Sequence, residues 1–409
     1  MDEQRVDYAA VTLWRLQKLR EAFAGFEMSA SAQDRSELAV WALTQQGWLE
    51  DYALFMALDQ AHSPALWPEW PAELALRDAA ALAKARASHA QEIDFWCFVQ
   101  WQFELQWQAI KSYAHSKGVR LVGDLPIFVA HHSADCWARP DLYVLDGSGQ
   151  PQVVAGVPPD FFSDTGQRWG NPLYNWDAMA REGYRWWIER VRRQLHLADL
   201  VRIDHFRGFV DYWEIPASEP NAVKGRWQPG PGEALFKALA LALGDLPIIA
   251  EDLGIITPEV SVLRERTGFP GMRVLQFAFS GDAGNAFLPH NFEPGTVVYT
   301  GTHDNDTVPG WWASCSAHER AFAAQYLGID GQMVHWAMVR AASFSVARFS
   351  LCQFQDVLGL GSEHRMNTPG TMGCWSWRFK WEWVDATVAR QLANITAACG
   401  RVSFDRLKI

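Results

Sequence analysis

Three carboxylates, Asp204, Glu251 and Asp304, each follow a short apolar and largely β-branched run of residues. Such runs are too short for helices and predict buried strands. Acids at the carboxyl ends of successive parallel strands converge on one mouth in a (β/α)8 barrel. A pair of carboxylates with a third helper is what cleavage of a glycosidic bond requires. The pattern therefore predicts a carbohydrate-active enzyme.

The neighbouring residues predict a different role for each acid. Arg202 lies two residues before Asp204, so both side chains project from one face of a strand. A guanidinium in that position keeps a carboxylate ionised, as a nucleophile requires. Glu251 ends an apolar strand, where desolvation would raise its pKa and suit a general acid/base. Asp304 is flanked by a His and an Asn and could hydrogen-bond sugar hydroxyls more strongly in the transition state.

Each acid also has a structural interpretation. A single acid at a strand end is commonly a helix N-cap or half of a salt bridge. Three such acids on separate strands, with Arg, His and Asn beside them, favour a functional interpretation. Asp124 is a fourth acid of this kind. We expect Asp124 to hold Arg202 or the neighbouring loop rather than to take part in the chemistry.

Composition narrows the possible partners and compartments. The net charge of −11 leaves no basic stripe to neutralise phosphates, so a nucleic acid is not expected as partner. The 22 Trp residues suit sugar faces but also fill cores, so they only support the prediction of a carbohydrate-active enzyme.

The six Cys residues lack paired spacing and fit reduced thiols. The first residues hold no signal-peptide core and no apolar run spans a membrane, so we expect a cytoplasmic protein. No His-rich ligand cluster is evident, and neither metal nor organic cofactor is expected.

Hydrophobic patterning predicts two regions. We expect residues 1–90 to form a helical subdomain. We expect residues 91–409 to form a barrel domain in which helices alternate with buried strands. The expected strands cover residues 119–126, 200–206, 247–252, 272–279, 296–300 and 349–358. A doubly wound open sheet would accept six strands, but the positions of the acids favour a barrel. Its two missing strands would be the first two.

The strings around the acids resemble the conserved stretches of the α-amylase superfamily. They are more similar to those of the 4-α-glucanotransferases, known as amylomaltases or disproportionating enzymes. The strings are Gly123–Val129 with Ser133–Trp137, Arg202–Gly208, Ala250–Gly254, His303–Asp306, Arg365–Gly370 and Trp375–Arg378. The resemblance implies that Asp204 is the nucleophile, Glu251 the acid/base and Asp304 the transition-state stabiliser. We expect further contacts to the substrate from Arg202, His205, His303 and Asn305.

A Gly/Pro-rich loop at about residues 153–176 is the most family-specific stretch. It resembles the glucan-binding loop of amylomaltases, which generic α-amylases lack. Such a loop, rich in aromatic and amide side chains, suits a lid that excludes water and holds sugar. The alternative that these aromatics form a local core stays open. Its candidate substrate-binding residues are Phe161, Phe162, Gln167, Trp169 and Asn171.

The chain also departs from the family pattern. Phe161 stands where the family often has Tyr, and Cys374 where it usually has Asn. Family members begin with a further segment that holds the first two barrel strands. A barrel without them exposes two edges. The sequence therefore predicts a fragment or a misassigned start, or closure by something else.

The resemblance implies a retaining enzyme that transfers α-1,4-glucan segments between maltooligosaccharides through a glycosyl-enzyme intermediate. An α-glucan hydrolase of the same superfamily shares the first half-reaction, so the carboxylates alone do not decide between the two. An inactive, truncated glucan-binding fragment is the alternative that is not an enzyme. Substrate length and oligomeric state are not set by the sequence.

Overall fold

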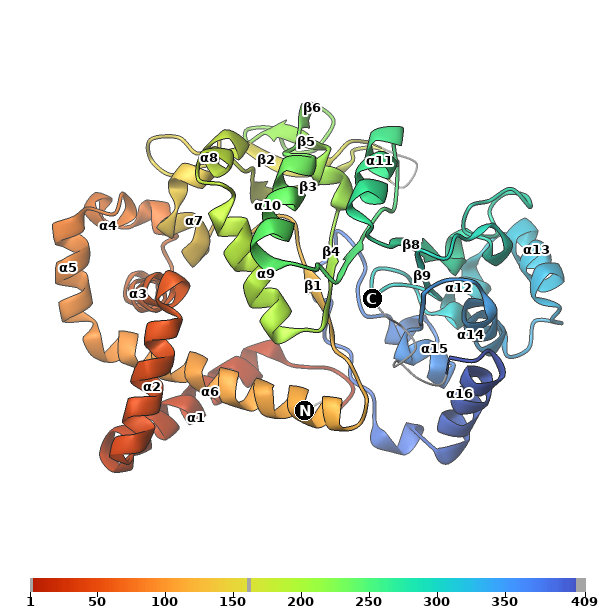
Figure 1. Cartoon of the computed structure of the whole chain (residues 1–409), viewed down its shortest axis with the longest axis horizontal. Helices are drawn as coiled ribbons and strands as arrows, with labels where there is room; N and C mark the ends of the chain where they lie inside the picture. Colours follow the sequence, from red (N-terminus) through yellow and green to blue (C-terminus); the bar gives the residue numbers. More distant parts are fainter. Residues whose placement is uncertain (1–2, 160–162, 402–409) are drawn as a thin grey trace. The chain divides into compact units, whose positions relative to one another are not determined.

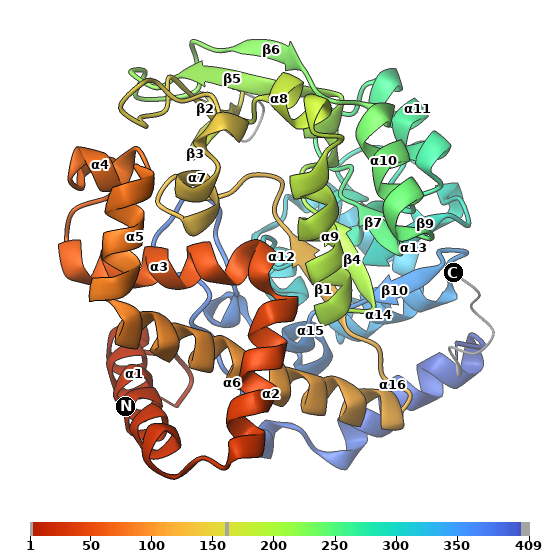
Figure 2. The same cartoon turned by 60° about the vertical axis from the view of Figure 1, so that its left-hand side comes forward.

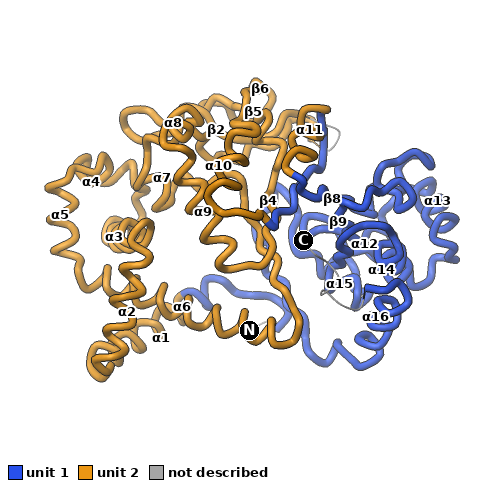
Figure 3. Tube along the Cα trace, in the orientation of Figure 1, with its two compact units in different colours: residues 1–12, 247–257, 268–409 blue, residues 13–246, 258–267 orange. Residues whose placement is uncertain are grey.

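The computed structural model of the chain describes residues 3–159 and 163–401. The chain forms two compact units, which Figure 3 distinguishes by colour. Unit 1 comprises Met1–Thr12, Pro247–Thr257 and Gly268–Ile409, and unit 2 comprises Leu13–Leu246 and Pro258–Thr267. The expected domain boundary near residue 90 lies inside unit 2 and stays a prediction.

The N-terminal part of the chain is helical, as predicted. Its elements are α1 (Tyr8–Ser29), α2 (Ala32–Thr44), α3 (Gln46–His62), η1 (Trp67–Glu69), α4 (Ala72–Ala75), α5 (Ala79–Ser88) and α6 (Ala90–Ser116). The start of α2 is fixed by a capping box, in which Ser31 accepts from the backbone of Asp34 and the Asp34 side chain accepts in return. Phe23, Phe95 and Trp101 are buried in the core that these helices share.

Strands β1 (Val122–Leu125) and β4 (Leu200–Ile203) form a parallel pair in unit 2, with Asp124 in register with Arg202. Helix α9 (Arg185–Leu197) packs on both strands and against α10 (Glu233–Leu243), as Figures 1 and 2 show. All four residues of β4 are buried. Asp204 therefore follows directly from a strand that its neighbours hold in place.

An antiparallel sheet in unit 2 was not predicted. It contains β2 (Val153–Val157), β3 (Gln167–Pro172), β5 (Asp211–Pro216) and β6 (Arg226–Pro229), in the order β3-β2-β5-β6. Much of the expected loop at residues 153–176 is therefore in strands, because β2 and β3 pair. The role of this stretch in glucan binding stays a prediction. Gly and Pro suggested a loop, but here glycine permits a close approach between strands.

Replacing Gly156 with Ala is expected to lower the free energy of unfolding by about 1–3 kcal/mol. A Cβ atom there would lie 2.2 Å from the Gln167 carbonyl oxygen and 2.6 Å from Cδ1 of Ile215. Urea unfolding monitored by fluorescence would measure the loss. Gly25→Ala in α1 is the matched control, because its Cβ meets no atom within 4 Å, and a gain of up to about 1 kcal/mol is expected. Equal stabilities of the two variants would contradict this prediction.

Unit 1 contains a second set of parallel strands. Strands β8 (Gly271–Val274), β9 (Thr296–Tyr299) and β10 (Phe349–Leu351) pair in the order β10-β9-β8, and β7 (Ile248–Ala250) lies against β8. Its helices are α12 (Val308–Ser314), α13 (Ala317–Leu327), α14 (Val334–Phe344), α15 (Phe354–Leu358) and α16 (Ala386–Ala398). Val298, Met338 and Leu275 belong to the buried core of this unit.

The expected strand at residues 349–358 is only partly correct. It ends at Leu351, and Phe354–Leu358 forms helix α15. Phe354, Val357 and Leu358 have the three- and four-residue spacing of a helix face, which the continuous apolar run concealed. Gly359, with φ of 69°, ends that helix.

Unit 2 also contains the α-helices α7 (Ala134–Ala138), α8 (Trp176–Arg181) and α11 (Pro258–Thr267) and the 3-10 helices η2 (Pro140–Leu142) and η3 (Phe206–Phe209). The structure is thus a helix-rich mixed α/β fold with parallel strand pairs. Among the described residues, we find no helix that combines the length and the hydrophobicity of a membrane span.

Candidate active site

Arg202 links two acids at the end of β4. Its Nη2 atom donates to Oδ1 of Asp204 at 2.8 Å, and its Nη1 atom donates to Oδ1 of Asp124 at 2.6 Å. The guanidinium is buried, whereas both carboxylates are partly exposed. Two predictions are confirmed: Arg202 and Asp204 share one face, and Asp124 holds Arg202.

His205 turns the chain immediately after Asp204. Its backbone lies in the left-handed region, with φ of 50°, which non-glycine residues seldom adopt outside constrained sites. Burial lowers the pKa of His205 to about 4, although the charge of Asp204 opposes this shift. The imidazole is therefore neutral near pH 7. Its ring meets the Trp169 ring edge-on, at a centroid distance of 5.0 Å.

Trp169, a described residue of the predicted lid, packs against this turn. Trp169 is 38 % exposed, and its Nε1 atom donates to Oε1 of Gln167 at 3.1 Å. Nδ2 of Asn171 donates to the Val129 carbonyl at 2.9 Å, which fastens β3 to the segment after β1. Phe161 and Phe162 lie outside the described residues. Trp169 is too exposed to be only a local core residue.

Two adjacent acids follow β7 and have different surroundings. Asp252 is buried, and its Oδ1 accepts from the Met272 backbone at 2.6 Å. A Cβ atom at Gly271 would lie 2.3 Å from Oδ2 of Asp252. Glu251 is partly exposed, and its Oε1 accepts from the Leu253 backbone at 3.0 Å. Asp252 thus joins the segment after β7 to β8, and Glu251 is the acid that solvent reaches.

Asp304 lies in a turn held by residues that the sequence did not single out individually. Nδ2 of Asn367 donates to Oδ1 of Asp304 at 2.5 Å, and Nη2 of Arg365 donates to its backbone carbonyl at 2.5 Å. Nε2 of His303 lies 3.4 Å from Oδ2. The family-like string Arg365–Gly370 marked this segment in the sequence. The string did not show that Arg365 and Asn367 contact Asp304.

His303 and Asn305 flank Asp304 in the same turn. Oδ1 of Asn305 accepts from both the backbone and the hydroxyl of Thr302, at 2.8 Å each, and so closes the turn. The His303 ring packs on Trp375 at a centroid distance of 4.9 Å. Trp375 is half-exposed and has φ of 62°. A bulky residue held in that conformation indicates a constrained position.

A fully buried carboxylate, Asp356, holds both ends of the turn that carries Asp304. One oxygen accepts from the Thr300 hydroxyl at 2.7 Å, at the end of β9. The other accepts from the Val308 backbone at 2.6 Å, at the start of α12. Burial raises the pKa of Asp356 to about 6, with a smaller contribution from the charge of Asp306. Sequence patterning gave no sign of this contact.

The raised pKa of Asp356 predicts a measurable effect of pH on stability. The folded value of about 6 exceeds the ordinary value of 3.8, so the folded chain binds more protons between those values. The contribution of this group to the unfolding free energy is therefore full below pH 3.8 and is lost as pH rises through about 6. Relative to Asp356→Asn, the wild-type chain should lose on the order of 3 kcal/mol between pH 4 and pH 7. Urea unfolding of both proteins at both pH values measures this, and a constant difference would contradict it.

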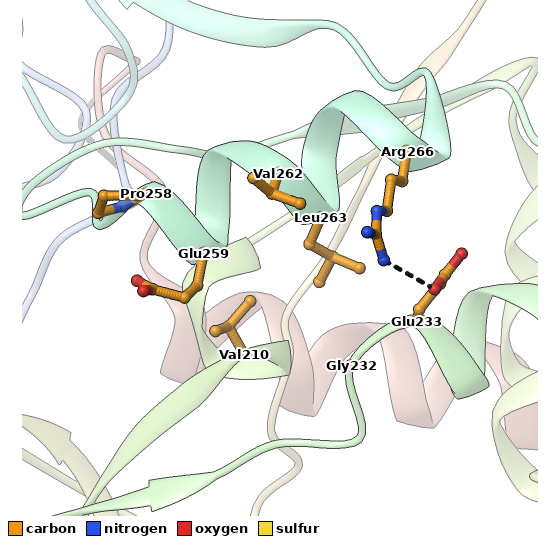
Figure 4. A pocket seen from close by; sticks show the side chains of 8 residues that line it. All are labelled: Val210, Gly232, Glu233, Pro258, Glu259, Val262, Leu263 and Arg266. Atoms are coloured by element: carbon orange, nitrogen blue, oxygen red, sulfur yellow. Dashed lines mark hydrogen bonds and ion pairs between the residues drawn. The ribbon is translucent and has the colours of Figure 1, made fainter.

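The predicted site residues that the structure describes are divided between the two units. Unit 2 holds Arg202, Asp204 and His205 with Gln167, Trp169 and Asn171, and unit 1 holds Glu251 together with His303, Asp304 and Asn305. A cavity of about 340 Å³ in unit 2 lies between Val210, the start of α10 and helix α11. Figure 4 shows Arg266 reaching across it to Glu233, at 3.3 Å. None of the predicted site residues lines this cavity.

Comparison with known proteins finds relatives of this chain in one family. A family model described as 4-alpha-glucanotransferase matches residues 1–385. The 4-alpha-glucanotransferase of Thermus thermophilus is 52 % identical over 383 residues, which cover 91 % of this chain and 77 % of the relative. That of Synechocystis is 46 % identical over 402 residues, which cover 97 % and 80 %. An amylomaltase from Streptococcus agalactiae, solved in complex with acarbose, superposes with a TM-score of 0.94 at 36 % identity, covering 98 % and 81 %.

The chain therefore belongs to the 4-alpha-glucanotransferase family, a class of glycosyltransferase-type enzymes. Its fold is that of an amylomaltase-like protein. The expected family resemblance is confirmed over nearly the whole chain.

Proposed function

We propose that the protein transfers segments of α-1,4-glucan to the 4-hydroxyl of an acceptor sugar by a retaining double displacement. The observation that carries the proposal is the family match over residues 1–385, which includes the strings around Asp204, Glu251 and Asp304. The similar amylomaltase from Streptococcus agalactiae was solved with acarbose, which supports maltooligosaccharides as the substrate class.

In the first half-reaction, a carboxylate oxygen of Asp204 attacks the anomeric carbon while the glycosidic C–O bond breaks. Glu251 gives its proton to the departing oxygen, and the glycosyl group is held as an ester on Asp204. In the second half-reaction, Glu251 takes the proton of an acceptor 4-hydroxyl, whose oxygen displaces the ester. Asp304 binds sugar hydroxyls most strongly in the transition state. The hydrogen bond from Arg202 to Asp204 supports this assignment, because it holds one carboxylate oxygen of Asp204 in place at the end of β4.

The contacts of the candidate substrate-binding residues suggest a role for each of them. We infer that the exposed face of Trp169 stacks on a sugar ring, with neutral His205 beside it. His303 and Arg202 act next to the acids that they contact, and Gln167 orients Trp169. Asn171 and Asn305 already hold backbone groups, so we infer that they act through the strand and the turn that they fix. Phe161 and Phe162 remain proposed lid residues.

We also infer the finer architecture. The parallel pairs β1–β4, β8–β9 and β9–β10, together with β7 against β8, support six strands of a (β/α)8 barrel in residues 91–409. We expect the helical subdomain in residues 1–90 to accompany it. Acids at the ends of β4, β7 and β9 fit the place where that fold carries its active sites. A cytoplasmic location and independence of metals and cofactors stay predictions.

Incubation of the purified chain with maltotriose tests the function. Transfer produces shorter and longer maltooligosaccharides while the total of reducing ends stays constant. Chromatography by length and a reducing-end assay measure both quantities. A steady rise in reducing ends would instead identify an α-glucan hydrolase, and a folded chain without products would overturn the proposal.

A further inference from the structure

Asn367 is fastened to the turn of Asp304 through its backbone and its side chain. Its backbone N–H donates to the His303 carbonyl at 3.1 Å. Its side-chain Nδ2 donates to Oδ1 of Asp304 at 2.5 Å. The amide group can therefore rotate little without breaking one of the two bonds. All these residues belong to unit 1.

Arg365 braces the two backbones that carry these side chains. Its Nη2 atom donates to the Asp304 carbonyl at 2.5 Å, and its Nε atom donates to the Asn367 carbonyl at 2.7 Å. A guanidinium is planar and rigid, so it fixes the separation of the two carbonyls. The distance from the Asn367 amide to the Asp304 carboxylate is thus set by Arg365 as well as by its own bond.

The second oxygen of Asp304 faces His303, with Nε2 at 3.4 Å. The ring of His303 packs on Trp375. The backbone of Trp375 is held by a bond to the Met366 carbonyl at 2.9 Å and by the Tyr8 hydroxyl at 2.6 Å. Both carboxylate oxygens therefore meet groups that are themselves held in place.

We propose that Asn367, braced by Arg365, is a positioning residue that fixes the orientation of the Asp304 carboxylate for glucan transfer. The inference rests on the proposed function, in which Asp304 acts on the sugar in the transition state. Misplacement of a reacting group by about 1 Å can cost on the order of 10²-fold in rate. The carboxylate is 41 % exposed, so without the Asn367 amide it can turn towards water.

The first arm of the test is the variant Asn367→Ala in the maltotriose assay. We expect kcat to fall about 10- to 100-fold while KM changes less than threefold, since the lost contact acts on the transition state. A kcat within twofold of wild type, or a loss confined to KM, would overturn the proposal. Asn291→Ala is the matched control, because its Nδ2 atom also donates to backbone carbonyls, of Ala283 and Asn285.

The second arm is Asn367→Asp, which places a second carboxyl against Asp304. The charged or titratable groups that face this position are His303, Arg365 and Cys374. Near pH 7 the two carboxylates repel each other, and we expect a loss similar to that of Asn367→Ala. At lower pH a shared proton restores the hydrogen bond, so activity relative to wild type should recover at least threefold. A ratio to wild type that does not change with pH would overturn the proposal.

The third arm does not depend on activity and separates this inference from the proposed function. Asp304→Ala, Asn367→Ala and the double variant are compared by thermal unfolding. If the two side chains are bonded, the double variant lowers Tm no further than the larger single change. Additive shifts would overturn the inference. If the wild-type chain makes no products in the maltotriose assay, the proposed function fails, and this cycle alone decides whether Asn367 holds Asp304.

Discussion

Replacing Asp204 with Asn is expected to lower transfer from maltotriose by about 10⁴-fold or more, because the variant has no nucleophile to form the glycosyl ester. The fold should persist, since Arg202 keeps its bond to Asp124. Steady-state assays with thermal unfolding of the same samples measure both. Asp245→Asn, an exposed change in unit 2, is the control and should keep full activity.

A chemical rescue makes this prediction more specific. Asp204→Ala leaves space beside the anomeric carbon, and azide with α-maltosyl fluoride should yield a β-maltosyl azide, because the small anion attacks from the vacated face. Substantial transfer by Asp204→Asn, or rescue with retained configuration, would contradict the assignment of the nucleophile.

Replacing Glu251 with Gln is expected to slow transfer from maltotriose by about 10²- to 10⁴-fold, because the leaving sugar oxygen no longer receives a proton. Fluoride leaves without that proton. With α-maltosyl fluoride, the variant should form the ester on Asp204 and then stall, since no base activates the acceptor. Mass spectrometry of the intact chain and of its peptides would show the added maltosyl group at Asp204.

Two outcomes would contradict the role of Glu251. One is turnover of maltotriose at the wild-type rate, and the other is failure of α-maltosyl fluoride to form the ester on Asp204 in the variant. Glu265→Gln on α11 is the control, because Glu265 is exposed. Binding of a maltooligosaccharide to Glu251→Gln should remain close to that of the wild-type chain, because the amide keeps the shape of the carboxyl group.

Local sequence patterns determine a strand, the face that two of its side chains share, and the family of this protein. The apolar run that ends at Asp204 gave β4, and the two-residue period of a strand placed Arg202 on the same face as Asp204. The strings around the acids gave the family, which the comparison confirmed. Each of these inferences depends only on residues that are close in the sequence.

Contacts between distant segments were decided only by the tertiary structure. Asp304 and Asn367 are 63 positions apart, and Asp356 is 56 positions from Thr300. No periodicity links such residues, because their hydrogen bonds depend on how separate strands and helices pack. Glycine-rich stretches show the same limit: Gly156 suggested a loop, but it lets β2 approach Gln167 in a sheet. Sequence alone thus pointed to the acids, whereas packing selected the partners that hold them. Arg202 and Asp356 are buried, and burial makes an unpaired polar group costly, so each is bonded to groups that only the fold brings near.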